Sequence, residues 1–183
     1  TAHNYGHIIR FTETGPAHAP TSFTWDVFLF AGDPTYPTQG GAKVQAGQPL
    51  FGSPDGIWVD PDGLVWIQTD ISNSSQNLAS RGYDRIGNNQ MLVADPATGE
   101  IKRFLTGPRG CEITGVITTP DGTTMFVNVQ HPGESTTFWN TANGTPSSAN
   151  PRTVSNWPEF SATGRPRPST IVIRRIDGGK VGS

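Results

Sequence analysis

The sequence has 183 residues, of which 33% are hydrophobic, a formal net charge of −2 and a single cysteine. This length suffices for one domain with a core or for part of a larger one. The near-neutral charge, without a basic block, argues against a nucleic-acid partner. One cysteine excludes an internal disulfide framework and a cysteine-rich zinc site. The 22 glycines and 16 prolines fit an all-β protein with many turns and do not fit a helical bundle. No apolar run approaches the roughly 18 residues of a membrane-spanning helix, so we expect no membrane partner.

The first third of the chain is predicted to contain two strands. Residues 5–12 (YGHIIRFT) and 22–31 (SFTWDVFLFA) are rich in apolar and β-branched residues, and the stretch between them has the glycines and prolines of a turn. A long loop over residues 32–52 follows, with little periodicity. A loop of this length in a compact domain is usually functional or lies over the surface.

An internal repeat organises the rest of the chain. Residues 56–70 (GIWVDPDGLVWIQTD) align with residues 115–130 (GVITTPDGTTMFVNVQ), and both copies turn at Pro-Asp-Gly. Each copy is followed by a polar loop and a second predicted hairpin, at 90–107 and at 169–183. Four antiparallel strands that recur every ~40–60 residues are typical of β-propeller blades.

The repeat predicts that residues 1–183 form a single all-β segment, roughly half of a β-propeller. We expect an opening pair of strands and two blades, at about 53–107 and 112–183. A β-sandwich is the alternative, since it also consists of strands punctuated by turns. Half a propeller leaves strand edges open, so we expect either a homodimer or an edge covered by loops.

Carboxylates stand at equivalent ends of the two Pro-Asp-Gly hairpins. Asp55 and Asp70 flank the first hairpin, and Glu112 and Glu134 flank the second. Because the two ends of a hairpin meet at one edge of a sheet, these side chains could converge. Carboxylate oxygens are the ligands that calcium prefers, so all four are candidate metal ligands. The ordinary interpretation is that Asp55 belongs to a turn and that Asp70 caps a strand end.

Three further residues near the second hairpin could carry chemistry. Arg109 is a candidate substrate ligand because a guanidinium group matches the geometry of phosphate oxygens. His131 is a second candidate substrate ligand; its alternatives are a metal or a simple turn hydrogen bond. Cys111 could be a ligand or nucleophile, but a lone cysteine at a strand start is more often a small buried residue. No nucleophile elbow, phosphate loop or dinucleotide fingerprint is present, so no catalytic residue is assigned.

Residues 110–134 (GCEITGVITTPDGTTMFVNVQHPGE) resemble the PhoX-type alkaline phosphatases, a family of secreted bacterial phosphomonoesterases. Residues 53–70 and 88–108, and the strands near the start, are similar to the same family in matching order. The resemblance implies a β-propeller and a calcium-dependent enzyme, with iron as a second candidate metal, that acts on small phosphate esters in the periplasm. It also implies that this segment is the C-terminal part of the enzyme and is inactive alone.

The resemblance bears on the candidate residues one by one. Asp55 matches a position that supplies a metal carboxylate in the family, Glu112 and Glu134 fall in its signature motif, and Asp70 ends another matching stretch. Cys111 does not inherit the role of the family's iron-binding cysteine, which lies far upstream. The alternative function is a non-catalytic propeller module that binds a partner or ligand on its loop face. A calcium-dependent sugar-lactone hydrolase ranks last, because it is not expected to share the His-Pro-Gly-Glu segment.

Overall fold

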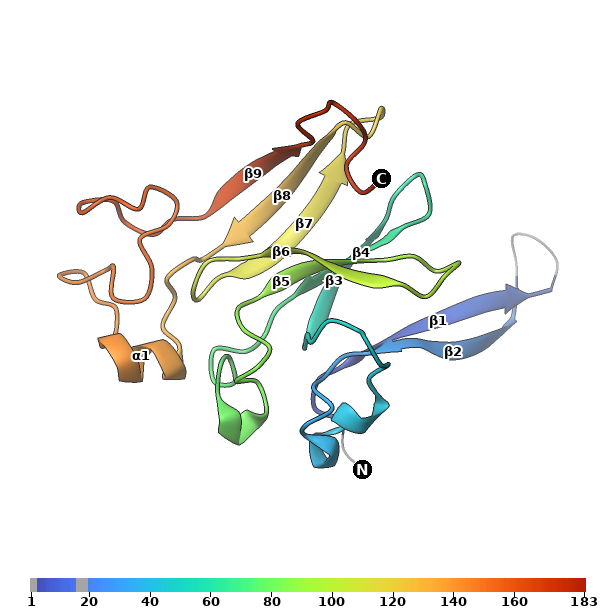
Figure 1. Ribbon diagram of the computed structural model, residues 1–183, viewed down its shortest axis with the longest axis horizontal. Helices are drawn as coiled ribbons and strands as arrows, with labels where there is room; N and C mark the ends of the chain where they lie inside the picture. The colour runs from blue at the N-terminus through green and yellow to red at the C-terminus, as the bar shows by residue number, and fades with distance from the viewer. Residues whose placement is uncertain (1–2, 16–19) are drawn as a thin grey trace.

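Three antiparallel sheets, one after another along the chain, make up the fold (Figure 1). The computed structural model describes residues 3–15 and 20–183. The strands are β1 (His7–Thr14) and β2 (Ser22–Phe30) in the first sheet, β3 (Pro54–Val59), β4 (Val65–Thr69), β5 (Gln90–Ala94) and β6 (Ile101–Thr106) in the second, and β7 (Glu112–Thr118), β8 (Thr124–Gln130) and β9 (Ser169–Arg174) in the third. The predicted all-β class is therefore confirmed.

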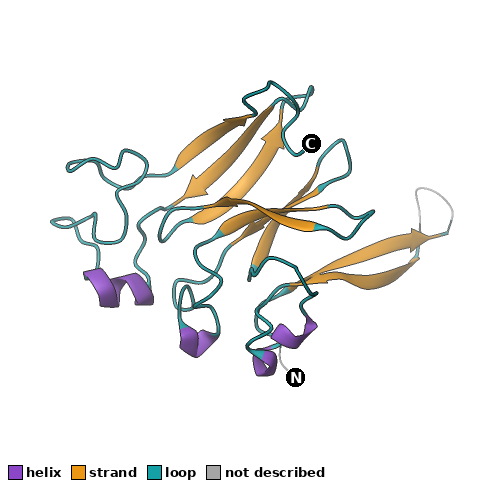
Figure 2. Ribbon diagram, in the orientation of Figure 1, coloured by secondary structure: helices purple, strands orange, loops and turns teal. Residues whose placement is uncertain are grey.

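The helices are short and lie in the loops. They are η1 (Pro37–Gln39), η2 (Gly41–Lys43), η3 (Ala79–Arg81) and α1 (Thr137–Asn143). Figure 2 shows them along one edge of the sheet array, where β4 and β8 end and their long loops begin. Among the described residues, no helix has the length and apolar character needed to cross a membrane.

The Pro-Asp-Gly turns form as the sequence predicts. In the β3–β4 turn, Asp60 Oδ1 accepts the backbone N–H groups of Asp62 and Leu64, each at 2.9 Å. In the β7–β8 turn, Asp121 Oδ1 accepts the N–H of Thr123 at 3.1 Å. The glycine of each turn has a positive φ, 90° at Gly63 and 72° at Gly122, a conformation that costs other residues more. The turn residues therefore fix where each hairpin reverses.

The middle sheet is covered on both faces, and its strands supply two separate cores. Successive side chains of a strand point to opposite faces. In β4, Ile67 packs with Leu29 and Phe51 toward the first sheet, whereas Trp66 packs with Met125 and Val127 toward the third. The two cores fix the middle sheet between its neighbours.

The last predicted strand does not form. The second sheet has the four strands expected of residues 53–107, but the third has three, and the chain after β9 continues as a turn and coil. Gly178 and Gly182 have positive φ, which is incompatible with extended backbone. Val181 instead buries its side chain, and its N–H donates to Gly122 O at 2.9 Å. The tail thus closes the core from the end of the sheet without pairing with β9.

Both outermost sheets expose apolar side chains. On the β1–β2 hairpin, Phe11 and Trp25 are cross-strand partners and are 59% and 64% exposed. On the third sheet, Phe126 and Val172 are partners on β8 and β9, and both are exposed. Exposed apolar faces of this kind usually contact another surface.

Candidate metal and phosphate site

The ends of four strands bring the candidate carboxylates to one region. Asp55 lies at the start of β3 and Asp70 follows β4, and the Asp70 N–H donates to Ser53 O at 3.0 Å. Glu112 begins β7 and is the partner of Gln130, the last residue of β8. β7 also contacts β3 and β4, which brings the two hairpins side by side. The strand ends that carry these residues therefore lie near one another, and their role as metal ligands stays a prediction.

His131 lies between two of these carboxylates. Its Nε2 is 3.4 Å from Glu112 Oε2, and its Nδ1 is 3.0 Å from Glu134 Oε2. Its backbone φ is 36°, an uncommon value for a residue with a Cβ. The turn after β8 therefore aims the imidazole back at the strand ends, where both ring nitrogens face carboxylates. In this arrangement His131 orients acidic groups; its predicted contact with substrate stays a prediction.

The acidic groups raise one another's affinity for protons. Partial loss of solvent raises the pKa of the Asp70 carboxyl, and the charge of Asp55 raises it further. The pKa of Glu112 is also raised, first by burial and then by the charge of Asp70, although its contact with His131 acts in the opposite direction. Like-charged groups at short range disfavour ionisation in this way. A cation bound among them would relieve this repulsion.

The donor chemistry suits a hard cation, but the set is not a complete site. Carboxylates from both hairpins lie close enough to affect one another's pKa, and carboxylate oxygens are the ligands that calcium prefers. Within residues 3–15 and 20–183, however, no three His, Cys, Asp or Glu side chains are arranged so that they could hold a metal ion. Any ion bound here needs either a shift of these side chains or further ligands.

A buried asparagine fastens the strands behind the site. Asn89 Oδ1 accepts the Thr69 hydroxyl at 2.8 Å and the Ile71 N–H at 2.6 Å, and its Nδ2 donates to Cys111 O at 2.9 Å. Asn89 is 1% exposed. These three bonds link the end of β4, the start of β5 and the residue before Glu112, so they hold the acidic strand ends in register.

Arg109 and Cys111 do not join the acidic cluster. The Arg109 guanidinium lies over the Trp139 ring, 4.1 Å from its centroid. Cys111 is a buried free thiol, and burial raises its pKa to about 12. A thiol that stays protonated is a poor nucleophile and metal ligand. The interpretation of Cys111 as a small buried residue is therefore confirmed.

Two amide side chains near the carboxylates were missed from the sequence. Gln130 Nε2 donates to Glu112 Oε2 at 2.8 Å, and Asn73 Nδ2 donates to Glu134 Oε2 at 2.7 Å. Asn73 lies in the polar loop that begins just beyond β4. Polar residues directly after a strand that ends at the site were the available signal.

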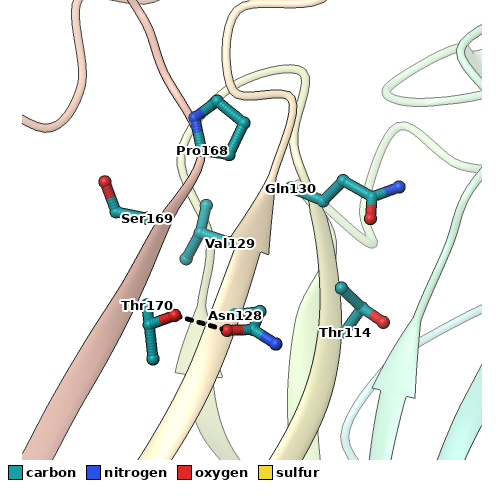
Figure 3. A pocket seen from close by; sticks show the side chains of 7 residues that line it. All are labelled: Thr114, Asn128, Val129, Gln130, Pro168, Ser169 and Thr170. Carbon is teal, nitrogen blue, oxygen red and sulfur yellow. Dashed lines mark hydrogen bonds between the residues drawn. The ribbon is translucent and has the colours of Figure 1, made fainter.

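A pocket of about 410 Å³ lies beside the site on the third sheet, and Gln130 stands at its rim (Figure 3). On its floor the Thr170 hydroxyl donates to Asn128 Oδ1 at 2.7 Å, so these two polar groups satisfy each other. The side chains that line it are uncharged: Thr114, Asn128, Val129, Gln130, Pro168, Ser169 and Thr170. The pocket therefore adds no charged group to the acidic cluster.

Comparison with known proteins places the chain in a family. The family model described as "Alkaline phosphatase PhoX" matches residues 1–133. Among solved structures, "Pseudomonas fluorescens PhoX in complex with vanadate, a transition state analogue" is 42% identical, with a TM-score of 0.77 over 98% of this chain. The chain spans 28% of that protein's chain. A search of curated proteins found no match. The chain belongs to the PhoX alkaline phosphatase family.

Proposed function

We propose that the chain forms part of a metal-dependent phosphomonoesterase, and that the acidic strand ends contribute to its active site. One observation carries the proposal. The carboxylates of two adjacent hairpins, on Asp55, Asp70 and Glu112, act on one another in a chain that aligns over 98% of its length with a vanadate-bound PhoX. Vanadate is described there as a transition-state analogue, which fits a small phosphate ester as the substrate.

Calcium is the proposed metal, with iron as a second candidate. Asp55 and Glu112 would be its main ligands here, and Asp70 and Glu134 weaker ones. When bound, calcium would supply positive charge that offsets the negative charge of the phosphate oxygens. The remaining ligands would come from outside the described residues, since the relative's chain is far longer. Cys111 is not proposed as an iron ligand, because its thiol is buried.

The other side chains of the site would orient these groups. His131 contacts Glu112 and Glu134 and would fix the direction of both carboxylates. Gln130 donates to Glu112 and would keep one of its oxygens in place. Arg109, held against Trp139, is the proposed cation for substrate phosphate or its ester group. His131 is proposed to reach substrate only if the carboxylates that it contacts are drawn away by a metal.

The proposed architecture is part of a β-propeller, with the sheets of β3–β6 and β7–β9 as blades. Two observations support it: neighbouring sheets share cores on both faces of the middle one, and the outermost sheets expose apolar side chains. Those exposed faces also support association with further sheets or with a second copy of the chain. Export to the periplasm is proposed from the family alone.

The test is phosphate release by the full-length protein carrying Glu112→Gln. This change keeps the size of the side chain and removes the charge, so activity should fall at least about tenfold and calcium affinity should fall with it. Glu100→Gln is the matched control, because Glu100 lies exposed in the β5–β6 turn and pairs with Lys102 of β6. Unchanged activity in the Glu112 variant would refute the proposed site. A wild-type protein without activity would favour a non-catalytic binding module.

A further inference from the structure

A second surface, beside the acidic cluster, has a different chemical character. Two adjoining cavities of about 570 and 470 Å³ share Arg109, Val154, Ser155, Asn156 and Phe160. Together they form one groove between the end of β6 and the loop before β9, which we call the Arg109–Phe160 groove. Its combined size is in the range of small-molecule sites.

The groove is cationic and aromatic. Two arginines, Arg109 and Arg152, and two aromatic residues, Trp157 and Phe160, are among the residues that line it. No Asp or Glu lines either cavity. Guanidinium groups and aromatic rings both stack on flat ring systems, and the arginines also attract anions. This combination suits a ligand that joins an anionic group to an aromatic ring.

Phe160 is held in the groove at a conformational cost. Its φ is 54°, a value that bulky residues rarely adopt, and its side chain is 70% exposed. Its N–H donates to Asn156 O at 2.9 Å, which closes the turn that presents the ring. A large apolar ring held exposed by strained backbone gains nothing for packing within this chain, and its place in the groove makes it available to a ligand.

The groove adjoins the proposed catalytic region through the turn after β8. The Gly133 N–H donates to Arg109 O at 2.8 Å, next to Glu134. On the other side of that turn, a Cβ placed at Gly133 would lie 3.4 Å from Ser155 Cβ, in the groove wall, and 2.8 Å from Pro166. The turn that carries Glu134 thus contacts two residues of the groove, Arg109 and Ser155.

We propose that the Arg109–Phe160 groove binds the alcohol part of the substrate and favours phosphate monoesters whose alcohol carries an aromatic ring. The phosphate lies at the acidic cluster beside Arg109, and the ring stacks on Phe160 in the cavity that Arg152 also lines. This inference rests on the proposed phosphatase function. Nucleoside monophosphates are the natural probe, because they carry a flat ring at a distance from the phosphate.

The experiment compares adenosine 5′-monophosphate with glycerol 1-phosphate in the full-length protein with calcium. Both esters release a primary alcohol, so their intrinsic reactivities are similar and a difference in kcat/KM reports binding of the ring. Wild type should prefer the nucleotide at least about tenfold, the effect of one good stacking contact. Phe160→Gly, which suits the positive φ, and Arg152→Ala should each lower kcat/KM for the nucleotide more than for glycerol 1-phosphate and so remove most of that preference.

Phe160→Tyr should keep the preference, and Phe11→Ala, an exposed aromatic change on β1, should leave it unchanged. Activity without a preference for the nucleotide, or a preference that survives Phe160→Gly, would overturn the groove assignment and leave the phosphatase proposal standing. A wild-type protein that hydrolyses neither ester would instead contradict the phosphatase proposal. Calorimetric binding of the nucleotide then decides the groove: weakening of about tenfold in Phe160→Gly supports it, and equal or absent binding overturns it.

Discussion

Replacing Asn89 with alanine should destabilise the fold far more than the loss of one surface side chain would. The substitution removes three short hydrogen bonds, from the Thr69 hydroxyl, from the Ile71 N–H and to Cys111 O, and a longer one of 3.5 Å to Ile71 O. Thr69, Ile71 and Cys111 are each at most 1% exposed. Water therefore cannot take over the lost hydrogen bonds unless the surrounding structure opens. An unpaired buried polar group costs about 1–3 kcal/mol, which gives a loss of at least about 3 kcal/mol for the set.

Urea denaturation followed by tryptophan fluorescence measures this loss. Asn88→Ala is the matched control, because Asn88 is only half-buried and its Nδ2 donates to one carbonyl, Gly107 O, at 3.1 Å. Its loss should cost about 1 kcal/mol or less. If Asn89→Ala costs no more than Asn88→Ala, the hydrogen-bonded link behind the acidic cluster does not support the fold as described.

Three further predictions concern the loop before β9, the acidic cluster and the exposed apolar sheets. Gly133→Ala should loosen the loop before β9, because Gly133 has a φ of 81° and the new Cβ would lie 2.8 Å from Pro166. Residues 144–168 should then be cleaved faster by a protease than in wild type, and equal rates would contradict the prediction. With a chelator present, the free energy of unfolding should fall as pH rises. The fall should begin at about pH 4, where carboxyl groups ionise in unfolded chains, and continue through the raised pKa values of Asp70 and Glu112 in the folded protein. The folded protein binds those protons more tightly, so urea midpoints should decline over that window, less so in Glu112→Gln, and a flat profile would contradict the repulsion. The isolated 183-residue chain should self-associate through its exposed apolar sheets; Trp25→Ser should shift it toward monomer in light scattering, and a monomeric wild type would refute this.

The local features of the fold could be predicted from residue patterns. The Pro-Asp-Gly turns placed the hairpins, because aspartate and glycine meet local backbone requirements that involve only a few neighbours. The convergence of Glu112 with the residues after β8 followed from the same hairpin geometry. The final strand was not predicted correctly, since Val181 gains more by closing the core than by pairing with β9.

The remaining parts depend on contacts between distant segments. Asn89 joins three strands, but its neighbours in the chain carry no sign of that role. Asn73 reaches Glu134 from a loop without periodicity. Phe160 enters the groove only because the loop before β9 folds back over Gly133. Patterns with a period of two reveal strands and their faces; they say nothing about which polar loops meet above them.

The most direct test of the central claim is phosphate release from p-nitrophenyl phosphate by the full-length protein at alkaline pH. The assay is run with calcium, after chelation, and after calcium is restored, with iron supplied in a parallel series. If the acidic strand ends bind a metal that the reaction requires, turnover should disappear on chelation and return when the metal is restored. Turnover that survives complete chelation, or no turnover with both metals supplied, would contradict the claim that these carboxylates form part of a metal-dependent phosphatase site.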